Sequence, residues 1–270
     1  MGRSISDPYD WKVAADVIPF LLLPIGVAFF IGVAVSTARK DRQRSDVWAM
    51  WAAARGWGYA TTWPQMIRGH SGGPFNKGGG RRADRAFWGT FDKVPMFGFR
   101  YRYTVSTGKS SQTFPFLMVG IRFPGAVFPP MSLTYERDFL FCRDKDLQFE
   151  NQQFNQTWRV KSHSARFAHD VLHPRTMDFL MRQPLKFKEL WFSGDVLFVC
   201  VAGDPDPDAA DALMRLLSDF MDLLPSHLLR EVGATDRKVD DSGPGVPIAE
   251  QRRRIAIVGE RSQSRARRPR

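Results

Sequence analysis

The sequence predicts an α+β fold, in which an N-terminal transmembrane helix precedes an antiparallel β-meander body with C-terminal helices and a disordered basic tail. Three features indicate this: an uncharged run at 17–38, a block rich in aromatic and β-branched residues at 86–123, and an apolar helical stripe at 209–224. A run of strands followed by helices is typical of the α+β class. The expected division is a short extracytoplasmic lead at 1–16, the transmembrane helix at 17–38, the soluble body at 39–233 and the Arg-rich tail at 234–270.

The run from Val17 to Ala38 is long enough to cross a bilayer. It holds no charged residue, and a helix of about 22 residues reaches ~33 Å against a hydrocarbon core of ~30 Å. Pro24 lies inside the run and is expected to kink the helix, which membrane helices tolerate. A signal peptide cleaved after Ser36-Thr37-Ala38 is disfavoured, because the apolar run is too long and its start is weakly basic.

Basic residues flank this run unequally, which predicts its orientation. Arg3 and Lys12 precede it, whereas four basic residues follow it directly: Arg39, Lys40, Arg42 and Arg44. Because the more basic flank of a span stays in the cytoplasm, the N-terminus is expected outside and the body inside.

Small residues recur every four positions on one face of the expected span, at Ala28, Gly32 and Ser36. This spacing lets two helix backbones approach closely, so these residues are candidates for self-association through the transmembrane helix. Small residues are also common in membrane helices that do not associate, and the sequence leaves both interpretations open.

The net charge of +11 lies mostly outside the body. Residues 39–44 hold four basic and one acidic residue, and residues 234–270 hold ten basic and five acidic ones, so only +3 remains elsewhere. A basic groove for nucleic acid is therefore disfavoured. Cys142 and Cys200 both lie in apolar runs without a C-x-x-C pattern, which excludes a zinc ribbon and predicts two buried free thiols in a reducing cytoplasm.

The body is expected to begin with a helix at 45–55, capped by Ser45 and ended by Gly56. Four tryptophans crowd around this helix, and they fit a membrane interface and a protein core equally well. They are Trp48, Trp51, Trp57 and Trp63.

The next segment, 70–82, has the glycine content of a loop, and strands are expected after it. In the run 97–103 aromatic residues alternate with glycine and arginine, which indicates one aromatic and one polar face. The expected strands of the meander are 86–91, 95–105 and 113–123, followed by short strands at 133–141, 147–149 and 156–161.

Helices and one hairpin are expected after the meander. Ser164 is expected to cap a helix that ends at Leu172, and Pro174 to open the next one, up to Met181. Strands at 187–192 and 196–201 flank a hairpin turn, and Asp206 with Pro207 begins a long amphipathic helix that Pro225 ends.

Two patterns suggest catalysis, and neither fits its context. Gly69 to Gly73 matches G-x-S-x-G around Ser71, but no buried strand precedes it and a glycine loop follows. His169 and His173 have the spacing of a helical metal pair, but Pro174 biases His173 away from the helical conformation. The sequence therefore predicts no catalytic residue, no metal ligand and no cofactor.

The body from about Trp48 to Pro225 resembles a group of uncharacterised single-pass membrane proteins found mainly in actinobacteria. The resemblance implies a membrane anchor and a soluble α+β body without an established activity, and the Arg-rich tail lies outside it. It rests on Ala54-Arg55-Gly56-Trp57, Gly73-Pro74-Phe75, Gly89 to Tyr103, Phe154-Asn155, Trp158-Arg159-Val160, Phe167-Ala168 and Asp170-Val171-Leu172-His173-Pro174-Arg175.

The expected function is a non-catalytic cytoplasmic binding or scaffolding module held at the inner membrane face. The alternative is a membrane-tethered hydrolase or metalloprotein that uses His169 and His173. Anionic lipid headgroups are the expected partner, nucleic acid is disfavoured because the tail lacks aromatic residues, and no protein partner is indicated. The tail contributes Arg252, Arg253, Arg254, Arg265, Arg267 and Arg268 to the lipid contact, although a merely solvated tail fits its composition as well.

Overall fold

The structure is a computed structural model that describes residues 35–108, 110–135, 147–184 and 186–234. It divides into two units, 1–47 and 48–270, of which the second holds the sheet. The tail after Ala234, Ala28, Gly32 and all but the last four residues of the expected span lie outside the described residues. No helix in the described ranges is both long enough and apolar enough to cross a membrane.

The second unit is built on one eight-stranded sheet in the order β1-β2-β3-β4-β8-β7-β5-β6. Every neighbouring pair of strands is antiparallel. The expected α+β class with an antiparallel sheet and C-terminal helices is therefore confirmed. The strands are β1 Gly58–Thr62, β2 Gly79–Phe91, β3 Val94–Ser106, β4 Ser111–Arg122, β5 Met131–Tyr135, β6 Trp158–Ser162, β7 Glu189–Ser193 and β8 Val196–Ala202.

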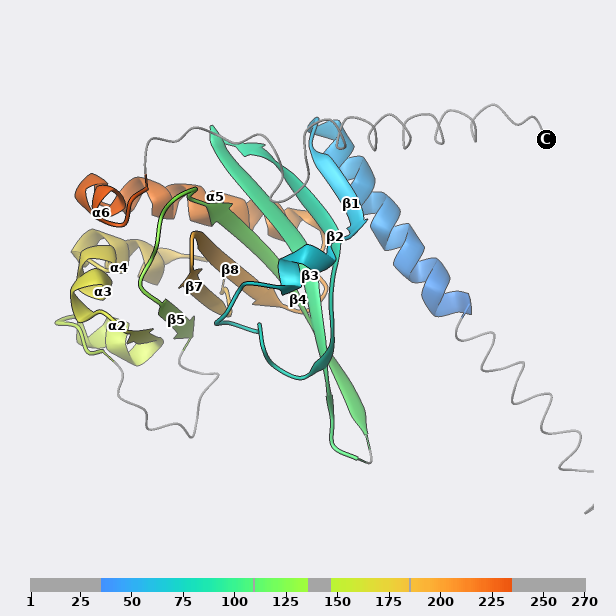
Figure 1. Cartoon of the computed structure of the whole chain (residues 1–270), viewed down its shortest axis with the longest axis horizontal. Coiled ribbons are helices and arrows are strands. Elements are labelled where there is room, and N and C mark those ends of the chain that lie inside the picture. Colours follow the sequence, from blue (N-terminus) through green and yellow to red (C-terminus); the bar gives the residue numbers. More distant parts are fainter. Residues whose placement is uncertain (1–34, 109, 136–146, 185, 235–270) are drawn as a thin grey trace, which may run out of the picture. The chain divides into compact units, whose positions relative to one another are not determined.

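The strands β2, β3 and β4 form the predicted meander, and β1, which was not predicted, pairs with β2 at its edge. The hairpin of β3 and β4 projects beyond the rest of the sheet (Figure 1). β2 begins at Gly79, because it pairs with the outer end of β3, where Gly79 lies opposite Thr104. The prediction of a loop over 70–82 was therefore wrong for its last four residues. Residues 147–149, which were expected to form a strand, have no regular secondary structure.

The second half of the sheet is not a continuation of the meander. β5 lies between β6 and β7, and β8 joins this group to β4. The first two residues of the expected strand 156–161 instead end a short helix, α2 Gln152–Thr157, which Asn151 caps.

The helices follow their capping residues. Ser164 accepts a hydrogen bond from Phe167 N–H at the start of α3 (Ala165–Val171), and Asp206 accepts one from Ala209 N–H at the start of α5 (Pro207–Leu223). Both N-caps were predicted. The second unit also holds η1 Pro64–Ile67, α4 Pro174–Arg182 and α6 Ser226–Glu231.

Two helices differ from the prediction. The helix expected at 45–55 runs without interruption over 35–54, so Ser45 is not its N-cap. α6 was not predicted; it follows Pro225, whose φ of −62° suits the start of a helix.

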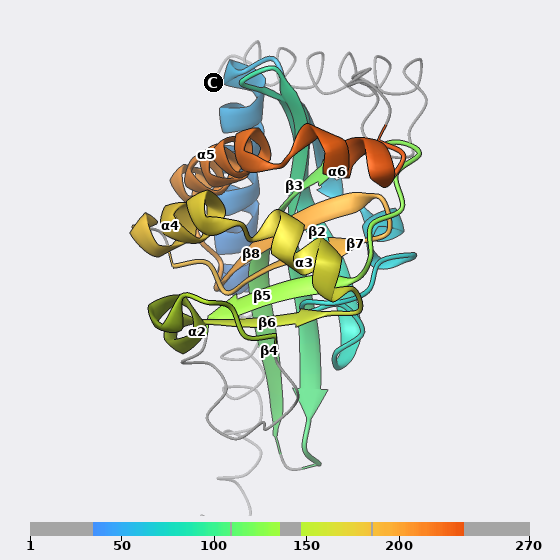
Figure 2. The ribbon, with the colours of Figure 1, turned by 90° about the vertical axis from the view of Figure 1, so that its left-hand side faces the viewer.

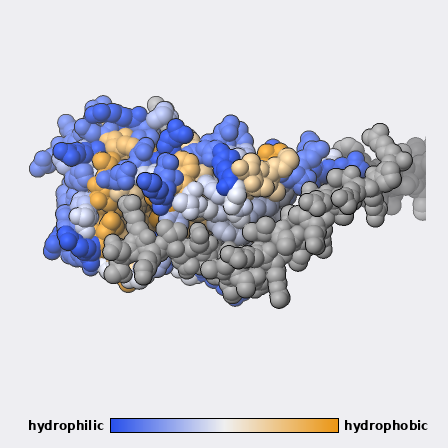
Figure 3. All heavy atoms as spheres, turned by 90° about the horizontal axis from the view of Figure 1, so that it is seen from above, coloured by the Kyte–Doolittle hydropathy of each residue, from blue (hydrophilic) through white to orange (hydrophobic). Residues whose placement is uncertain are grey.

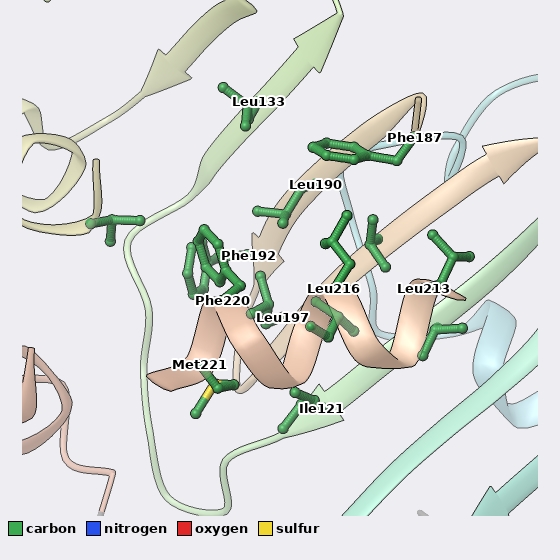
Figure 4. Close-up of a cluster of buried hydrophobic side chains, with 14 of the residues drawn as sticks. Ile121, Leu133, Phe187, Leu190, Phe192, Leu197, Leu213, Leu216, Phe220 and Met221 are labelled. Carbon is green, nitrogen blue, oxygen red and sulfur yellow. The ribbon is translucent and has the colours of Figure 1, made fainter. Parts of the chain in front are cut away.

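One face of the sheet is covered by helices, with α5 lying across the strands (Figure 2). The apolar stripe of α5 faces the sheet, where Leu213, Leu216 and Phe220 lie against side chains such as Leu190 and Leu197 (Figure 4). Over the C-terminal helices the surface is largely hydrophilic, with a band of hydrophobic residues (Figure 3).

The tryptophans belong to the protein interior. Trp48 is 4% exposed and stacks on Phe87, and Trp63 is 3% exposed. Trp51 and Trp57 are half-buried and also contact Phe87. Of the two interpretations that the sequence left open for these residues, the structure supports the core.

Candidate functional site: the strap-covered face

The face of the sheet opposite α5 is covered by an irregular segment, residues 63–78, which we call the strap. Successive side chains of a strand point to opposite faces of the sheet. Leu190 and Phe192 of β7 belong to the helix-covered core, whereas Trp191, between them, belongs to the hydrophobic cluster on the opposite face. The strap includes η1 and then turns at glycines, of which Gly72 and Gly73 have φ of 81° and 52°. Only glycine adopts such angles readily, so the sequence H-S-G-G-P can follow this sharp path close to the sheet.

Three alternate side chains of β7 hold the strap. The indole Nε1 of Trp191 donates to the carbonyl oxygen of Ser71 at 3.0 Å, and the backbone N–H of Ser71 donates to Ser193 Oγ at 2.9 Å. The backbone amide of Gly73 lies close enough to the carboxylate of Glu189 to favour its charged form. These residues, Glu189, Trp191 and Ser193, lie at every second position and therefore on one face of the strand; we call them the clasp.

Phe75 is the part of the strap that enters the apolar layer. It is 3% exposed. Its ring centroid lies 5.1 Å from that of Tyr101, 5.4 Å from Phe198 and 6.0 Å from Trp191, all in edge-to-face arrangements. Edge-to-face pairs are favourable beyond the area they bury, so Phe75 fixes the strap on the sheet.

Several buried polar atoms of this layer have no hydrogen-bond partner within the described part of the chain: Trp63 Nε1, His70 Nδ1 and Tyr101 OH. Burial is the main cause that lowers the pKa of His70, and Arg122 lowers it further while Asp195 opposes the shift. Burial also raises the pKa of Tyr101. Both groups are therefore held in their uncharged forms near neutral pH.

Glu189 and Cys200 lie opposite each other on β7 and β8. Burial raises the pKa of Glu189, although Lys77 and the Gly73 amide favour its charged form. Burial, together with the nearby Glu189, raises the pKa of the Cys200 thiol. Cys200 is thus a buried protonated thiol, as predicted, and thiolate chemistry is disfavoured there. Cys142 lies outside the described residues.

A charged network joins β2 and β3 to the loop before α5. Arg100 pairs with Asp84 and, at 3.0 Å, with Asp204. Arg85 also reaches Asp204, at 2.8 Å, from a position with φ of 49°, next to a register shift in β2. Because each charge in the network has an opposite partner, this arrangement serves to position the loop before α5.

The histidines proposed for the metalloprotein alternative have separate partners. His173 caps α4, and its Nε2 lies 2.9 Å from the carbonyl oxygen of Leu223 and 3.1 Å from Thr176 Oγ1. The exposed ring of His169 packs against Phe149, with 4.8 Å between ring centroids. Within the described ranges, no three His, Cys, Asp or Glu residues are grouped closely enough to hold a metal ion. The prediction that Pro174 keeps His173 out of the helix is consistent with its extended φ and ψ of −68° and 166°.

The other predicted site residues are only partly described. Arg39, Lys40, Arg42, Arg44 and Ser36 lie on the helix and are exposed. The six arginines of the tail, together with Ala28 and Gly32, lie outside the described residues.

The clasp and Phe75 were missed by sequence reasoning. A usable signal existed: in the strand sequence E-L-W-F-S, a carboxylate, an indole and a hydroxyl occupy alternate positions. The aromatic face predicted for 97–103 also required a cover, and Phe75 is the buried aromatic residue of the nearby glycine loop.

No family model matches the chain, and no curated protein matches it. Among solved structures, the mycobacterial trehalose monomycolate transport factor A, TtfA, is similar, with a TM-score of 0.51 and 15% sequence identity. The similarity covers 68% of this chain and 97% of that chain. It shows that the two proteins share a fold.

Proposed function

We propose that this chain is a non-catalytic binding or scaffolding module, anchored by residues 17–38 with its body at the inner face of the cell membrane. The observation that supports this most is the uncharged run followed at once by four exposed basic residues. The fold shared with a protein named as a transport factor also favours binding over hydrolysis. The resemblance to uncharacterised single-pass membrane proteins of actinobacteria supports the membrane anchor in this proposal.

The proposed lipid contact has two parts. Arg39, Lys40, Arg42 and Arg44 would lie next to the headgroups, and the tail, if disordered as its composition predicts, would bring its arginine clusters to the same surface. Each basic residue near an anionic surface contributes about 1 kcal/mol. Self-association through Ala28, Gly32 and Ser36 is part of the proposal for the span.

Fusions to the C-terminus test the topology. Alkaline phosphatase fused there should be inactive and a fluorescent protein bright, because the body is expected inside. The opposite pattern would overturn both the orientation and the compartment.

Vesicle flotation of the full-length chain tests the lipid contact. Replacing Arg39, Lys40, Arg42 and Arg44 with Gln should weaken binding to anionic vesicles at low salt and change little at high salt. The matched control replaces four exposed basic residues of the body, namely Arg166, Arg175, Arg182 and Lys186, with Gln. Equal losses in both variants would show that net charge, rather than the position of the four residues, determines binding.

A separate measurement tests the non-catalytic part. Purified full-length protein should contain no stoichiometric zinc, and His169→Ala and His173→Ala should not change its metal content. Zinc that is lost on either substitution would establish the metalloprotein alternative.

A further inference from the structure

The residues around Phe75 form a socket with an apolar wall and a polar edge. The wall consists of Phe99, Tyr101, Trp191 and Phe198, each with its ring centroid within 6.5 Å of that of Phe75. His70 completes the ring contacts at 5.7 Å. A benzyl side chain fills this socket in the closed strap.

Two of the side chains around Phe75 hold polar atoms that Phe75 cannot satisfy. Tyr101 is fully buried, and its hydroxyl has no hydrogen-bond partner among the described residues. The buried Nδ1 atom of His70 also has no hydrogen-bond partner among them. Leaving a buried polar atom unpaired is costly, and such atoms in native proteins usually have a role. Phenylalanine therefore matches the shape of the socket but not its hydrogen-bonding capacity.

The strap that holds Phe75 is fastened by few contacts. Its backbone meets the clasp through Ser71 and Gly73, whereas Gly69, Ser71 and Gly72 are exposed. Phe75 N–H bonds within the strap, to the carbonyl oxygen of Gly72, and not to the sheet. The segment from Gly69 to Phe75 can therefore leave the sheet without breaking any strand pairing.

We propose that the strap is a lid and that Phe75 occupies a binding socket for an uncharged amphiphile, whose apolar part replaces the Phe75 ring and whose hydroxyl or ether oxygen bonds to Tyr101 OH and His70 Nδ1. An uncharged oxygen group fits because neither polar group of the socket carries a charge near neutral pH. This inference rests on the proposed binding role of the body, but it does not depend on the membrane anchor or on the basic residues.

A matched pair of tyrosine variants tests the socket. The probe is octyl β-D-glucoside at concentrations below micelle formation, added to the full-length chain and followed by calorimetry. Tyr101→Phe should weaken binding about tenfold, because one hydrogen bond is lost. Tyr103→Phe is the control, since Tyr103 lies on the same face of β3 but is half-exposed and stacks on Phe114.

Tyr101→Phe should also raise the unfolding midpoint or leave it unchanged, because it removes an unpaired buried hydroxyl. A fall in stability together with unchanged probe binding would show that Tyr101 is only a core residue and would overturn the proposal.

A disulfide lock tests the lid. In a Cys142→Ser background, Ser71→Cys with Ser193→Cys joins the strap to β7 where Ser71 N and Ser193 Oγ are 2.9 Å apart. The oxidised protein should lose probe binding at least tenfold, and reductant should restore it. Equal binding in both redox states contradicts a lid, and if the bond does not form, the tyrosine pair decides.

Two further ligands identify the chemistry. Glucose, which lacks the chain, and octyltrimethylammonium, which lacks hydroxyl and ether groups, should each bind much more weakly than octyl glucoside. Equal binding of octyltrimethylammonium would show non-specific apolar adsorption, and equal binding of glucose would show a sugar site without an apolar socket. If vesicle binding proves independent of the basic residues while octyl glucoside binding is intact, the lipid contact alone is overturned.

Discussion

The two faces of the one sheet are covered in different ways. On the first face, α5 places a continuous stripe of aliphatic and aromatic side chains on the strands, and its own backbone hydrogen bonds lie within the helix. On the second face, a glycine-rich strap covers aromatic residues and depends on three side chains of β7 for its attachment.

The difference indicates which cover can move. A helix that leaves the sheet would expose a large apolar stripe and the core beneath it, whereas opening of the strap between Gly69 and Phe75 would expose Phe75 and the rings that it contacts. Local opening is favoured where few backbone hydrogen bonds must break, and the strap meets this condition. We therefore expect the helix-covered face to determine global stability and the strap-covered face to determine local dynamics.

The largest effect should come from the helix-covered face. Phe220 is fully buried under α5, so Phe220→Ala should reduce the free energy of unfolding by about 3–5 kcal/mol. Phe75→Ala removes the same ring but should cost only about 1–3 kcal/mol, because the strap can settle into the space. Urea unfolding of both variants checks this comparison, and equal losses would contradict it.

The next effect separates two glycines of the strap. A Cβ on Gly73 would lie 2.7 Å from the Trp191 ring, whereas a Cβ on Gly69 meets nothing within 4 Å, and both residues have positive φ. Gly73→Ala should therefore cost about 2 kcal/mol and Gly69→Ala about 1 kcal/mol, because only the first adds a clash to the backbone strain. Hydrogen exchange of the strap amides should accelerate in Gly73→Ala alone; the same acceleration in Gly69→Ala would mean that the Trp191 contact does not hold the strap.

A smaller effect isolates one hydrogen bond of the clasp. Ser193→Ala removes the acceptor of the Ser71 N–H and should cost about 1 kcal/mol. The loss should appear as faster exchange at Ser71, with the strand amides of β7 unchanged. Ser218→Ala, at a buried serine of α5, serves as the control and should not affect the strap; an effect on the strap from this variant would show that the two faces are coupled.

Local patterns in the sequence were sufficient for α5 on the first face and for the aromatic side chains that β3 contributes to the second face. The apolar spacing of 209–224, with Asp206 and Pro207 at its start, predicts α5 because capping and amphipathicity are properties of adjacent residues. The alternation over 97–103 likewise predicts the aromatic face of β3. Neither pattern depends on the rest of the chain.

The cover of the second face could not be predicted in the same way. The strap has no periodic pattern, and β7, to which it is attached by bonds spanning 120 and 122 residues, is too far along the chain for local sequence to pair the two segments. The place of β5 between β6 and β7 is a similar case, because strand order depends on packing between distant segments. His70 lies inside the G-x-S-x-G pattern, and no local signal indicates that its ring contacts Phe75 and Phe198.

The smallest expected effects concern pH, and they have opposite signs at Glu189 and His70, the two groups of the strap-covered layer that titrate between pH 4 and 8. Burial raises the pKa of Glu189 above its ordinary value of 4.5, so the folded state binds the proton first as the pH falls. Stability should therefore increase as the pH falls through the raised pKa toward 4.5. Glu189→Gln should remove this increase.

Protonation of His70 should change the stability in the opposite direction, in the pH interval below 6.5. Its pKa is lowered from 6.5, so the unfolded state binds the proton first, and stability is lost as the pH falls from 6.5 to the lowered pKa. His70→Gln should remove this loss.

The charged groups that face these residues are Arg122 and Asp195 near His70, and Lys77, Lys161 and Lys188 near Glu189. Urea unfolding of both variants from pH 4 to 8 measures how the free energy of unfolding depends on pH. Both groups lie beneath or within the strap, and neither lies under α5. The two substitutions should therefore alter the pH dependence of amide exchange in the strap as well as that of global unfolding. If both variants kept the pH profile of the unsubstituted protein, the burial of these groups beneath the strap would be contradicted.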